Sequence, residues 1–220
     1  MPAERYHDAV WQSVPEGARP GDLALRRAFL LERLAALAPR DDRANGGHGP
    51  RVLDVGCGEG QLAAELARAG GRVLGIDVAE EALRRARERY PGLELQLVPE
   101  RGPWPLADAS FDVVWAGDTI EHVADTASWL SEVRRVLRSG GTLLLSTPAH
   151  DRLALFALAL WPGRFDRHFD PRSDHLRFYT ARTLRRLLED FRFEDVELRR
   201  AGGLPGARRL LLAAARRARF

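Results

Sequence analysis

Lysine is absent from this chain of 220 residues, and all 34 basic side chains are arginine. A phosphate loop of the Walker type needs a lysine next to a serine or threonine, so the sequence excludes this class of nucleotide site. The arginines also explain a sequence pI of 9.7 at a net charge of only +3, because guanidinium groups titrate very late. We interpret the pI as amino-acid usage and expect no nucleic-acid partner.

Cysteine and long apolar runs are scarce as well. Cys57 is the single cysteine, so no disulfide can form within the chain, and this favours a cytoplasmic location. The first ten residues lack the apolar core of a signal peptide. The longest apolar run, at 153–161, has about half the length that a membrane-spanning helix needs. With 45% hydrophobic residues, the chain is typical of a globular protein with one main domain.

Short apolar strands alternate with helical patterns through the middle of the chain. We predict strands at 51–56, 72–77, 93–98, 111–116 and 142–147, and helices at 61–69, 79–90 and 126–138. Such alternation is typical of a parallel sheet covered by helices on both faces. The expected fold class is therefore α/β: a doubly wound, Rossmann-like, mostly parallel sheet. Right-handed crossovers would place the C-terminal ends of its strands at one edge, where ligands bind.

Flanking segments complete the expected organisation. Residues 1–50 are predicted to form an N-terminal helical cap and linker, with a helix at 22–38 that Asp22 would cap. The main domain would cover 51–200, with a helix after Thr180, a strand at 192–200 and an insertion at 148–179.

The C-terminal segment carries arginines around the run LLLAAA. We predict a basic amphipathic helix at 201–220. Such a helix could make peripheral contact with an anionic membrane, pack on its own domain, or join a homodimer.

The stretch VLDVGCGEG, residues 52–60, ends the first predicted strand in three alternating glycines. Gly56, Gly58 and Gly60 would present backbone amides and a helix N-terminus to a ligand. A dinucleotide-binding turn has the pattern Gly-x-Gly-x-x-Gly, and Gln61 occupies its third glycine position here. The turn alone therefore leaves the ligand open.

Acidic residues at neighbouring strand ends narrow the choice. Asp77 ends the second strand, where its carboxylate could accept both hydroxyls of a ribose, and Glu100 follows the third, near an expected adenine amino group. Asp54 lies within the first strand's end, and its natural partner is a turn amide or a ligand ammonium. These residues suit a nucleoside that carries an amino acid and no phosphates. The alternative is that Asp77 and Glu100 only cap helices.

Four stretches resemble the successive motifs of class I S-adenosylmethionine-dependent methyltransferases. They are VLDVGCGEG, GIDVAEEALRRAR, PLADASFDVVWAGDTIEHV and EVRRVLRSGGTLLLSTP, in this order over residues 50–150. The resemblance implies S-adenosylmethionine as cofactor and S-adenosylhomocysteine as product. The glycines would hold the methionine part, Asp77 the ribose, and Glu100 with the Arg101 backbone the adenine. The departure is VPERGPW, where the family usually has a Gly-Asp pair. The cofactor-binding residues expected are Asp54, Gly56, Cys57, Gly58, Gly60, Asp77, Val78, Glu100, Arg101 and Gly117.

The end of the fourth strand, AGDTIEHV, carries candidate catalytic residues. Methyl transfer from a sulfonium needs an aimed nucleophile, exclusion of water and at most one base. Asp118 and His122 are four residues apart, so one helical turn would place both on the same face. His122 is the candidate general base, because histidine titrates near neutral pH. The alternative is a helix-start histidine with a local hydrogen bond.

Asp118, Glu121 and His122 also resemble the magnesium-binding motif of ubiquinone-pathway O-methyltransferases and small-RNA 2′-O-methyltransferases. There, carboxylates and histidine hold a divalent ion that polarises the accepting hydroxyl. Asp118 stands where glutamate is commoner, and a further ligand would have to come from His150, His168 or His175. Metal-free relatives also carry Glu-His-Val, so we expect no metal.

The insertion 148–179 is predicted to be a lid over the acceptor, although a surface helix with a packed aromatic cluster is the alternative. The expected substrate residues are Trp11, Phe165, His168, His175, Arg177 and Tyr179. An O-methyltransferase of a small molecule is the leading prediction. An N- or C-methyltransferase, an RNA 2′-O-methyltransferase and a non-catalytic cofactor-binding subunit remain open.

Overall fold

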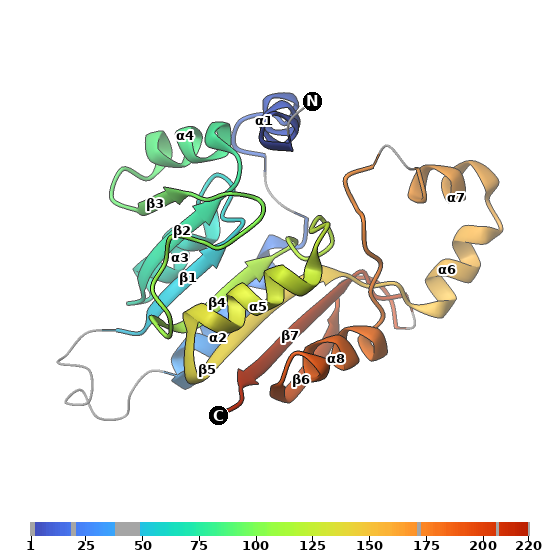
Figure 1. Ribbon diagram of the computed structural model, residues 1–220. Coiled ribbons are helices and arrows are strands. Elements are labelled where there is room, and N and C mark those ends of the chain that lie inside the picture. Colours follow the sequence, from blue (N-terminus) through green and yellow to red (C-terminus); the bar gives the residue numbers. More distant parts are fainter. Residues whose placement is uncertain (1–2, 19–20, 38–48, 171–172, 206, 220) are drawn as a thin grey trace.

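A seven-stranded sheet forms the centre of the computed structural model, which describes residues 3–18, 21–37, 49–170, 173–205 and 207–219 (Figure 1). The strand order is β3-β2-β1-β4-β5-β7-β6. Among the described strands, β7 is the one that pairs antiparallel with both neighbours, and the pairs among β3, β2, β1, β4 and β5 are parallel. The strands are β1 (Arg51–Val55), β2 (Arg72–Asp77), β3 (Glu94–Leu97), β4 (Phe111–Gly117), β5 (Leu137–Pro148), β6 (Phe193–Ala201) and β7 (Leu210–Arg217). The predicted α/β, mostly parallel sheet is confirmed.

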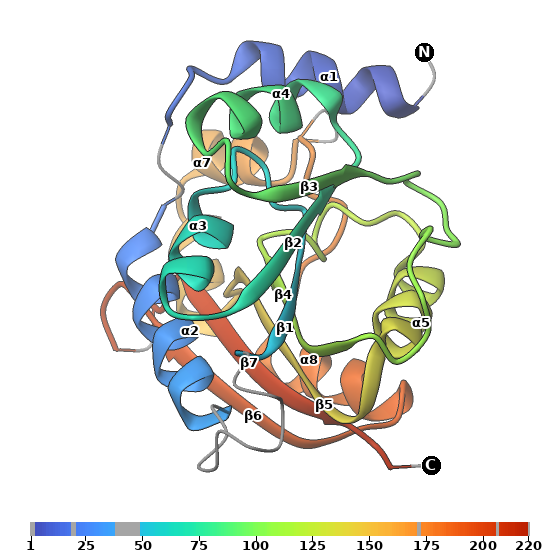
Figure 2. The ribbon, with the colours of Figure 1, turned by 90° about the vertical axis from the view of Figure 1, so that its left-hand side faces the viewer.

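Eight helices accompany the sheet in the described residues: α1 (Ala3–Ser13), α2 (Leu23–Leu37), α3 (Gln61–Arg68), α4 (Glu80–Arg89), α5 (Thr126–Val136), α6 (Arg152–Ala159), α7 (Pro162–His168) and α8 (Ala181–Asp190). Side chains of α2 and α3 share one apolar core with the sheet, and those of α5 and α8 share the other. Figure 2 shows these two pairs on opposite sides of the strands. The doubly wound arrangement follows.

Alternation along the central strands explains why both faces are covered. Val52 of β1 faces the core with α2 and α3, whereas Leu53 and Val55 face the core with α5 and α8. Successive side chains of a strand point to opposite faces, so a strand that is apolar at both sets of positions must be buried on both sides. The site therefore has to lie at an edge of the sheet, where strands end.

The C-terminal segment corrects one expectation. Residues 210–217 form β7, not an amphipathic helix, and β7 lies between β5 and β6 inside the sheet. Leu211 and Ala213 face one core and Leu212 and Ala214 the other, and all four are buried. A run of six apolar residues has no polar face to place in water, and its length suits a strand rather than a helix. The predicted membrane contact required this helix, so it is wrong as well.

Smaller differences occur at element ends. The helix predicted at 126–138 ends at Val136, because Leu137 takes extended backbone angles and starts β5 beside Phe111. Asp22 offers its carbonyl to the first amides of α2, but its carboxylate pairs with Arg209 instead of capping the helix. Most of the predicted linker, residues 38–48, lies outside the described residues.

The insertion 148–179 forms α6 and α7, which stand apart from the sheet (Figure 1). Neither helix has a buried residue. Apolar side chains in and between these two helices are exposed, among them Leu153, Phe156 and Trp161. No helix in the described part of the chain is long and apolar enough to cross a membrane.

Candidate active site at the carboxyl edge of the sheet

A cavity of about 750 Å³ lies where β1, β2, β3 and β4 end. This size is within the range of small-molecule sites in proteins. Loops after these four strands line it, together with one face of α1 and the start of α5. The lining residues are His7, Val10, Trp11, Val14, Val55, Gly56, Ile76, Asp77, Val78, Val98, Glu100, Arg101, Gly102, Pro103, Trp104, Asp118, Thr119, His122, Val123, Ala124, Asp125, Ala127, Ser128, Trp129, Ser131, Glu132 and Asp174.

The glycine turn after β1 requires glycine for two physical reasons. Gly56, Gly58 and Gly60 have φ angles of 70°, 53° and 74°, in the left-handed region. A Cβ on Gly56 would also lie 2.6 Å from Thr119 Oγ1, so a side chain cannot fit there. Gly56 lines the cavity, whereas Gly58 and Gly60 shape the turn behind it. The backbone is thus left open to a ligand at Gly56.

Asp77 ends β2 at the cavity wall, as predicted. Its carboxylate accepts hydrogen bonds from the amides of Gly58 and Ala79, both at 2.9 Å. Burial raises the pKa of Asp77, while these amides oppose the rise. The residue therefore ties the glycine turn to β2 and offers its carboxylate to the cavity.

Asp54 is buried within β1 and does not line the cavity. Its Oδ2 has no hydrogen-bond partner among the described residues. Burial and the nearby Asp77 raise the pKa of Asp54 to about 8. Near neutral pH this carboxyl therefore carries a proton.

Asn in place of Asp54 is expected to change how stability depends on pH. The folded chain keeps the Asp54 proton up to about pH 8, whereas the unfolded chain releases it near the ordinary value of 3.8. Between these values only the folded state holds the proton, so stability falls as pH rises, by about 1.4 kcal/mol per pH unit. Denaturant unfolding between pH 5 and pH 8 should show a shallower fall for Asp54→Asn than for the unchanged chain. Parallel curves for the two proteins would contradict this assignment.

The residue after β2 and the loop after β3 supply an apolar wall with one acid. Val78, Val98 and Trp104 line the cavity, and so do Glu100 and Arg101, where the sequence placed the adenine contact. Trp104 is only 5% exposed, and its amide donates to Glu132 at 2.8 Å. An aromatic and two valines beside a carboxylate can take a flat heterocycle with an amino group. Among the other predicted cofactor residues, Cys57 is largely buried in the turn, and a Cβ on Gly117 would meet the Trp115 ring.

Asp118 follows β4 and is held by two neighbours. It forms an ion pair with Arg26 of α2 and accepts a hydrogen bond from Ser146 Oγ at 3.0 Å. The Arg26 side chain is 6% exposed and lies behind Asp118, which lines the cavity. This engagement favours a positioning role for Asp118 over proton transfer. The sequence analysis missed Arg26, although it lies on the same helical stripe as Phe29 and Leu30.

His122 lines the cavity and is oriented by Asp174. Its Nδ1 lies 2.9 Å from the carbonyl oxygen of Asp174, and a carbonyl can only accept, so Nδ1 donates. Neutral imidazole carries one N–H, which leaves Nε2 free to take a proton. This tautomer is the one that a general base needs.

Glu121 lies beneath His122 and is 1% exposed. One carboxylate oxygen accepts from Thr147 Oγ1 at 2.9 Å, and the other has no partner among the described residues. Ligand atoms of Glu121, His122 and His175 all lie within 4.8 Å of one another. The histidine that joins this group is thus His175. In the described structure, His150 and His168 instead pack near Phe178 in an aromatic cluster.

The predicted substrate residues are divided by the structure. Trp11 lines the cavity, and the other five do not. Phe165 packs on Phe169 in α7, Arg177 donates to the Ala124 carbonyl at 2.8 Å, and Tyr179 is buried. The neighbouring Asp174 is the one residue of the insertion among the cavity-lining residues. The proposal that the insertion acts as a lid therefore rests on movement of α6 and α7, and it stays a prediction.

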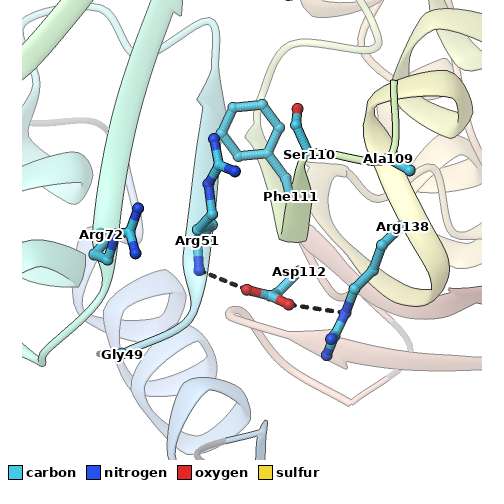
Figure 3. Close-up of a pocket in the computed structure, with 8 residues that line it drawn as sticks. All are labelled: Gly49, Arg51, Arg72, Ala109, Ser110, Phe111, Asp112 and Arg138. Carbon is cyan, nitrogen blue, oxygen red and sulfur yellow. Dashed lines mark hydrogen bonds and ion pairs between the residues drawn. The ribbon is translucent and has the colours of Figure 1, made fainter. Parts of the chain in front are cut away.

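A smaller cavity of about 210 Å³ lies at the opposite edge of the sheet, next to the starts of β1, β2 and β5 (Figure 3). Asp112 accepts there from the Arg51 amide at 2.7 Å and pairs with Arg138 at 2.8 Å. Its carboxylate is thereby satisfied by the protein itself. Catalytic groups of open α/β sheets gather at the other edge, so we assign this cavity a structural role.

Comparison with known proteins agrees with the geometry. A family model described as a methyltransferase domain matches residues 53–145. A ubiquinone biosynthesis O-methyltransferase from Dinoroseobacter shibae is 33% identical over 179 residues, which cover 79% of this chain and 72% of that protein. The chain belongs to the class I S-adenosylmethionine-dependent methyltransferases.

Two further similarities bear on this methyltransferase. A protein from Mycolicibacterium smegmatis named as a probable S-adenosylmethionine-dependent methyltransferase is 40% identical over 146 residues, covering 66% of this chain and 52% of that protein. A crystal structure of a methyltransferase of the same cofactor from Methanosarcina mazei has a TM-score of 0.61 at 26% identity, covering 78% of this chain and 93% of that one. The chain spans about half the length of the first mycobacterial relatives.

Proposed function

We propose that this methyltransferase transfers the methyl group of S-adenosylmethionine to a hydroxyl oxygen of a small molecule. The observation that carries the proposal is a single cavity lined by Gly56, Asp77 and His122 together. Cofactor-binding and proton-accepting groups are thus brought together at one strand edge, as transfer between two bound molecules requires.

The residues present fit the cofactor at three places. Gly56 lines the cavity in a left-handed backbone conformation, so an amino-acid moiety can approach the turn there. Asp77 offers its carboxylate to ribose hydroxyls, and Val78, Val98 and Trp104 offer an apolar wall beside Glu100.

His122 acts as the base in this proposal. Bound S-adenosylmethionine supplies an electrophilic methyl group on a sulfonium, and its sulfur leaves as a neutral thioether, so no acid is needed. Asp174 fixes the Nδ1–H tautomer and Nε2 removes the hydroxyl proton as the oxygen attacks the methyl carbon. Asp118, held by Arg26 and Ser146, lines the wall of the same space.

The test is methyl transfer from methyl-labelled S-adenosylmethionine to a panel of phenols, aliphatic alcohols and amines. The proposal predicts labelled methyl ether from at least one hydroxyl compound, together with one S-adenosylhomocysteine per ether formed. Labelled methylamine alone would move the acceptor atom to nitrogen. No transfer to any acceptor, despite cofactor binding, would favour a non-catalytic subunit.

A second candidate function uses the same histidine as a metal ligand. Glu121, His122 and His175 offer a carboxylate and two imidazoles within 4.8 Å, a set that suits a divalent ion. When bound there, such an ion would lower the pKa of the acceptor hydroxyl and replace the base. His122 cannot serve as base and as ligand through the same nitrogen, so an experiment separates the two.

Exhaustive chelation is expected to leave the activity of the purified enzyme unchanged, because His122 can remove the proton by itself. Turnover would be measured before and after dialysis against EDTA, and again after addition of Mg²⁺, Mn²⁺ or Zn²⁺. Activity that disappears on chelation and returns with one of these ions would replace the base mechanism by the metal-assisted one. Glu121→Gln gives the matching variant, since it keeps the side-chain shape and removes the anionic ligand.

A further inference from the structure

Helix α1 covers the cofactor side of the cavity from outside the sheet. Figures 1 and 2 show it lying along α4. His7, Val10 and Trp11 of α1 line the cavity, together with Val14, which follows the helix. The Trp11 ring lies against the glycine turn so closely that a Cβ on Gly58 would come within 2.8 Å of it. A ligand bound at the turn therefore has α1 as its outer wall.

The contact between α1 and the turn is held by a buried acid. Glu59 lies between Gly58 and Gly60, and its side chain is 4% exposed. It accepts from the Gly17 amide, which follows α1, at 2.9 Å, and pairs with Arg85 at 3.3 Å and Arg89 at 2.9 Å. A carboxylate this deep needs such partners, because an unpaired buried charge is strongly unfavourable.

Arg85 of α4 connects the acid to the end of α1. Its guanidinium donates to the carbonyl oxygens of Trp11 and Val14, both at 2.9 Å. These carbonyls lie at the C-terminal end of α1, where a cation interacts favourably with the helix dipole. Arg85 also pairs with Glu81 at 2.7 Å, so its planar fork reaches the turn, α4 and α1 together.

We infer that Glu59 and Arg85 are positioning residues that lock α1 over the bound cofactor, so that release of the cofactor requires this ion pair to part from α1. The inference rests on the proposed function, because it concerns the same pocket. The inference gives a role to Glu59, which belongs to the glycine turn, does not line the cavity and bonds to the segment after α1. Neither residue touches the reacting groups, and both act through the position of Trp11 and Val14.

The physical consequence is a coupling between α1 and the cofactor. While Arg85 holds the Trp11 and Val14 carbonyls, the apolar side chains of α1 stay on the cavity and exclude water from the ligand. Without it, α1 keeps the Trp11 contact with the turn and the hydrogen bond that the Glu81 amide donates to Asp8 at 3.1 Å. The segment after α1 keeps the Gly17–Glu59 hydrogen bond and the Arg84–Glu16 ion pair. The helix then opens more often, and the ligand leaves more often.

Hydrogen–deuterium exchange and cofactor release in Arg85→Gln test the inference. We expect amides of 6–14 to exchange at least tenfold faster than in the unchanged protein, while β1, β2 and α3 keep their rates. Stopped-flow release of S-adenosylhomocysteine should accelerate at least tenfold with little change in the association rate. Glu59→Gln, which keeps the side-chain shape, should show the same pattern if Arg85→Gln folds poorly.

Arg87→Gln is the matched control, because Arg87 lies on the same helix and, among the residues that the structure describes, forms an ion pair only with the exposed Glu80. It should leave both rates within twofold. The inference is overturned if Arg85→Gln and Glu59→Gln leave α1 exchange unchanged, or if exchange of the whole sheet rises by the same factor. Exchange in the ligand-free protein decides this separately from the proposed function, which fails instead if the unchanged protein takes up no S-adenosylhomocysteine.

Discussion

Alanine in place of Asp77 is expected to weaken binding of S-adenosylhomocysteine at least 100-fold, or by about 2.8 kcal/mol. Two losses add up in this variant. The proposed contact with the ribose is lost, and the Gly58 and Ala79 amides lose the acceptor that ties the glycine turn to β2. Donors left without a partner in a buried site cost more than the hydrogen bond itself contributes. Isothermal titration calorimetry measures the dissociation constant directly.

Asp112→Ala is the matched control for Asp77→Ala. Asp112 is also a strand carboxylate that accepts a backbone amide, but it lies at the opposite edge of the sheet (Figure 3). This variant should lose stability and still bind S-adenosylhomocysteine within about twofold of the unchanged protein. Equal loss of affinity in both variants would mean that general destabilisation, and not the ribose contact, explains the effect.

Alanine in place of His122 is expected to lower kcat by about 100- to 1000-fold, the usual contribution of a positioned base. His122 lines the cavity and its Nδ1 is held by Asp174, so removing the ring removes the proposed proton transfer through Nε2. The dissociation constant of S-adenosylhomocysteine should therefore stay within about threefold. Steady-state kinetics with an active acceptor, over a pH range of 6 to 9, provide the measurement.

His168→Ala serves as the comparison for His122→Ala. His168 belongs to α7, packs near His150 and Phe169, and does not line the cavity. It should retain kcat within about twofold. Full turnover of His122→Ala on the same acceptor would remove the base from the mechanism.

The common position of the expected cofactor residues could be predicted because each of them is local in sequence to a strand end. Gly56, Asp77 and Glu100 each follow a short apolar strand, and parallel strands with right-handed crossovers bring such ends to one edge. A residue that stands at the end of a predicted strand is therefore already placed at this edge by the sequence alone. Five of the predicted cofactor residues line the cavity, and the glycines behind them shape its turn.

Residues brought in from distant elements could not be predicted in the same way. Arg26 reaches Asp118 across 92 positions of the chain, and Arg85 reaches the Trp11 carbonyl across 74. Such pairs depend on how helices pack on the sheet, which no local pattern specifies. The Glu121–His122–His175 group has the same origin, since the segment carrying His175 returns to β4 only after α6 and α7.

The C-terminal segment forms a strand instead of the predicted helix for a different reason. The arginines on both sides of six apolar residues favour a helix with basic ends, and no period contradicts it over so short a run, although the length of the run favours a strand. Tertiary pairing decides between them: β5 and β6 leave a gap in the sheet that β7 fills in antiparallel register. Only the structure shows that gap.

The most direct test of the account is calorimetric titration of the unchanged protein with S-adenosylhomocysteine, with ATP and NAD as comparison ligands. The cavity described above predicts saturable uptake of one S-adenosylhomocysteine per chain and no measurable heat from the two phosphate-bearing nucleotides. Absence of binding by S-adenosylhomocysteine, or equal binding of all three ligands, would contradict it.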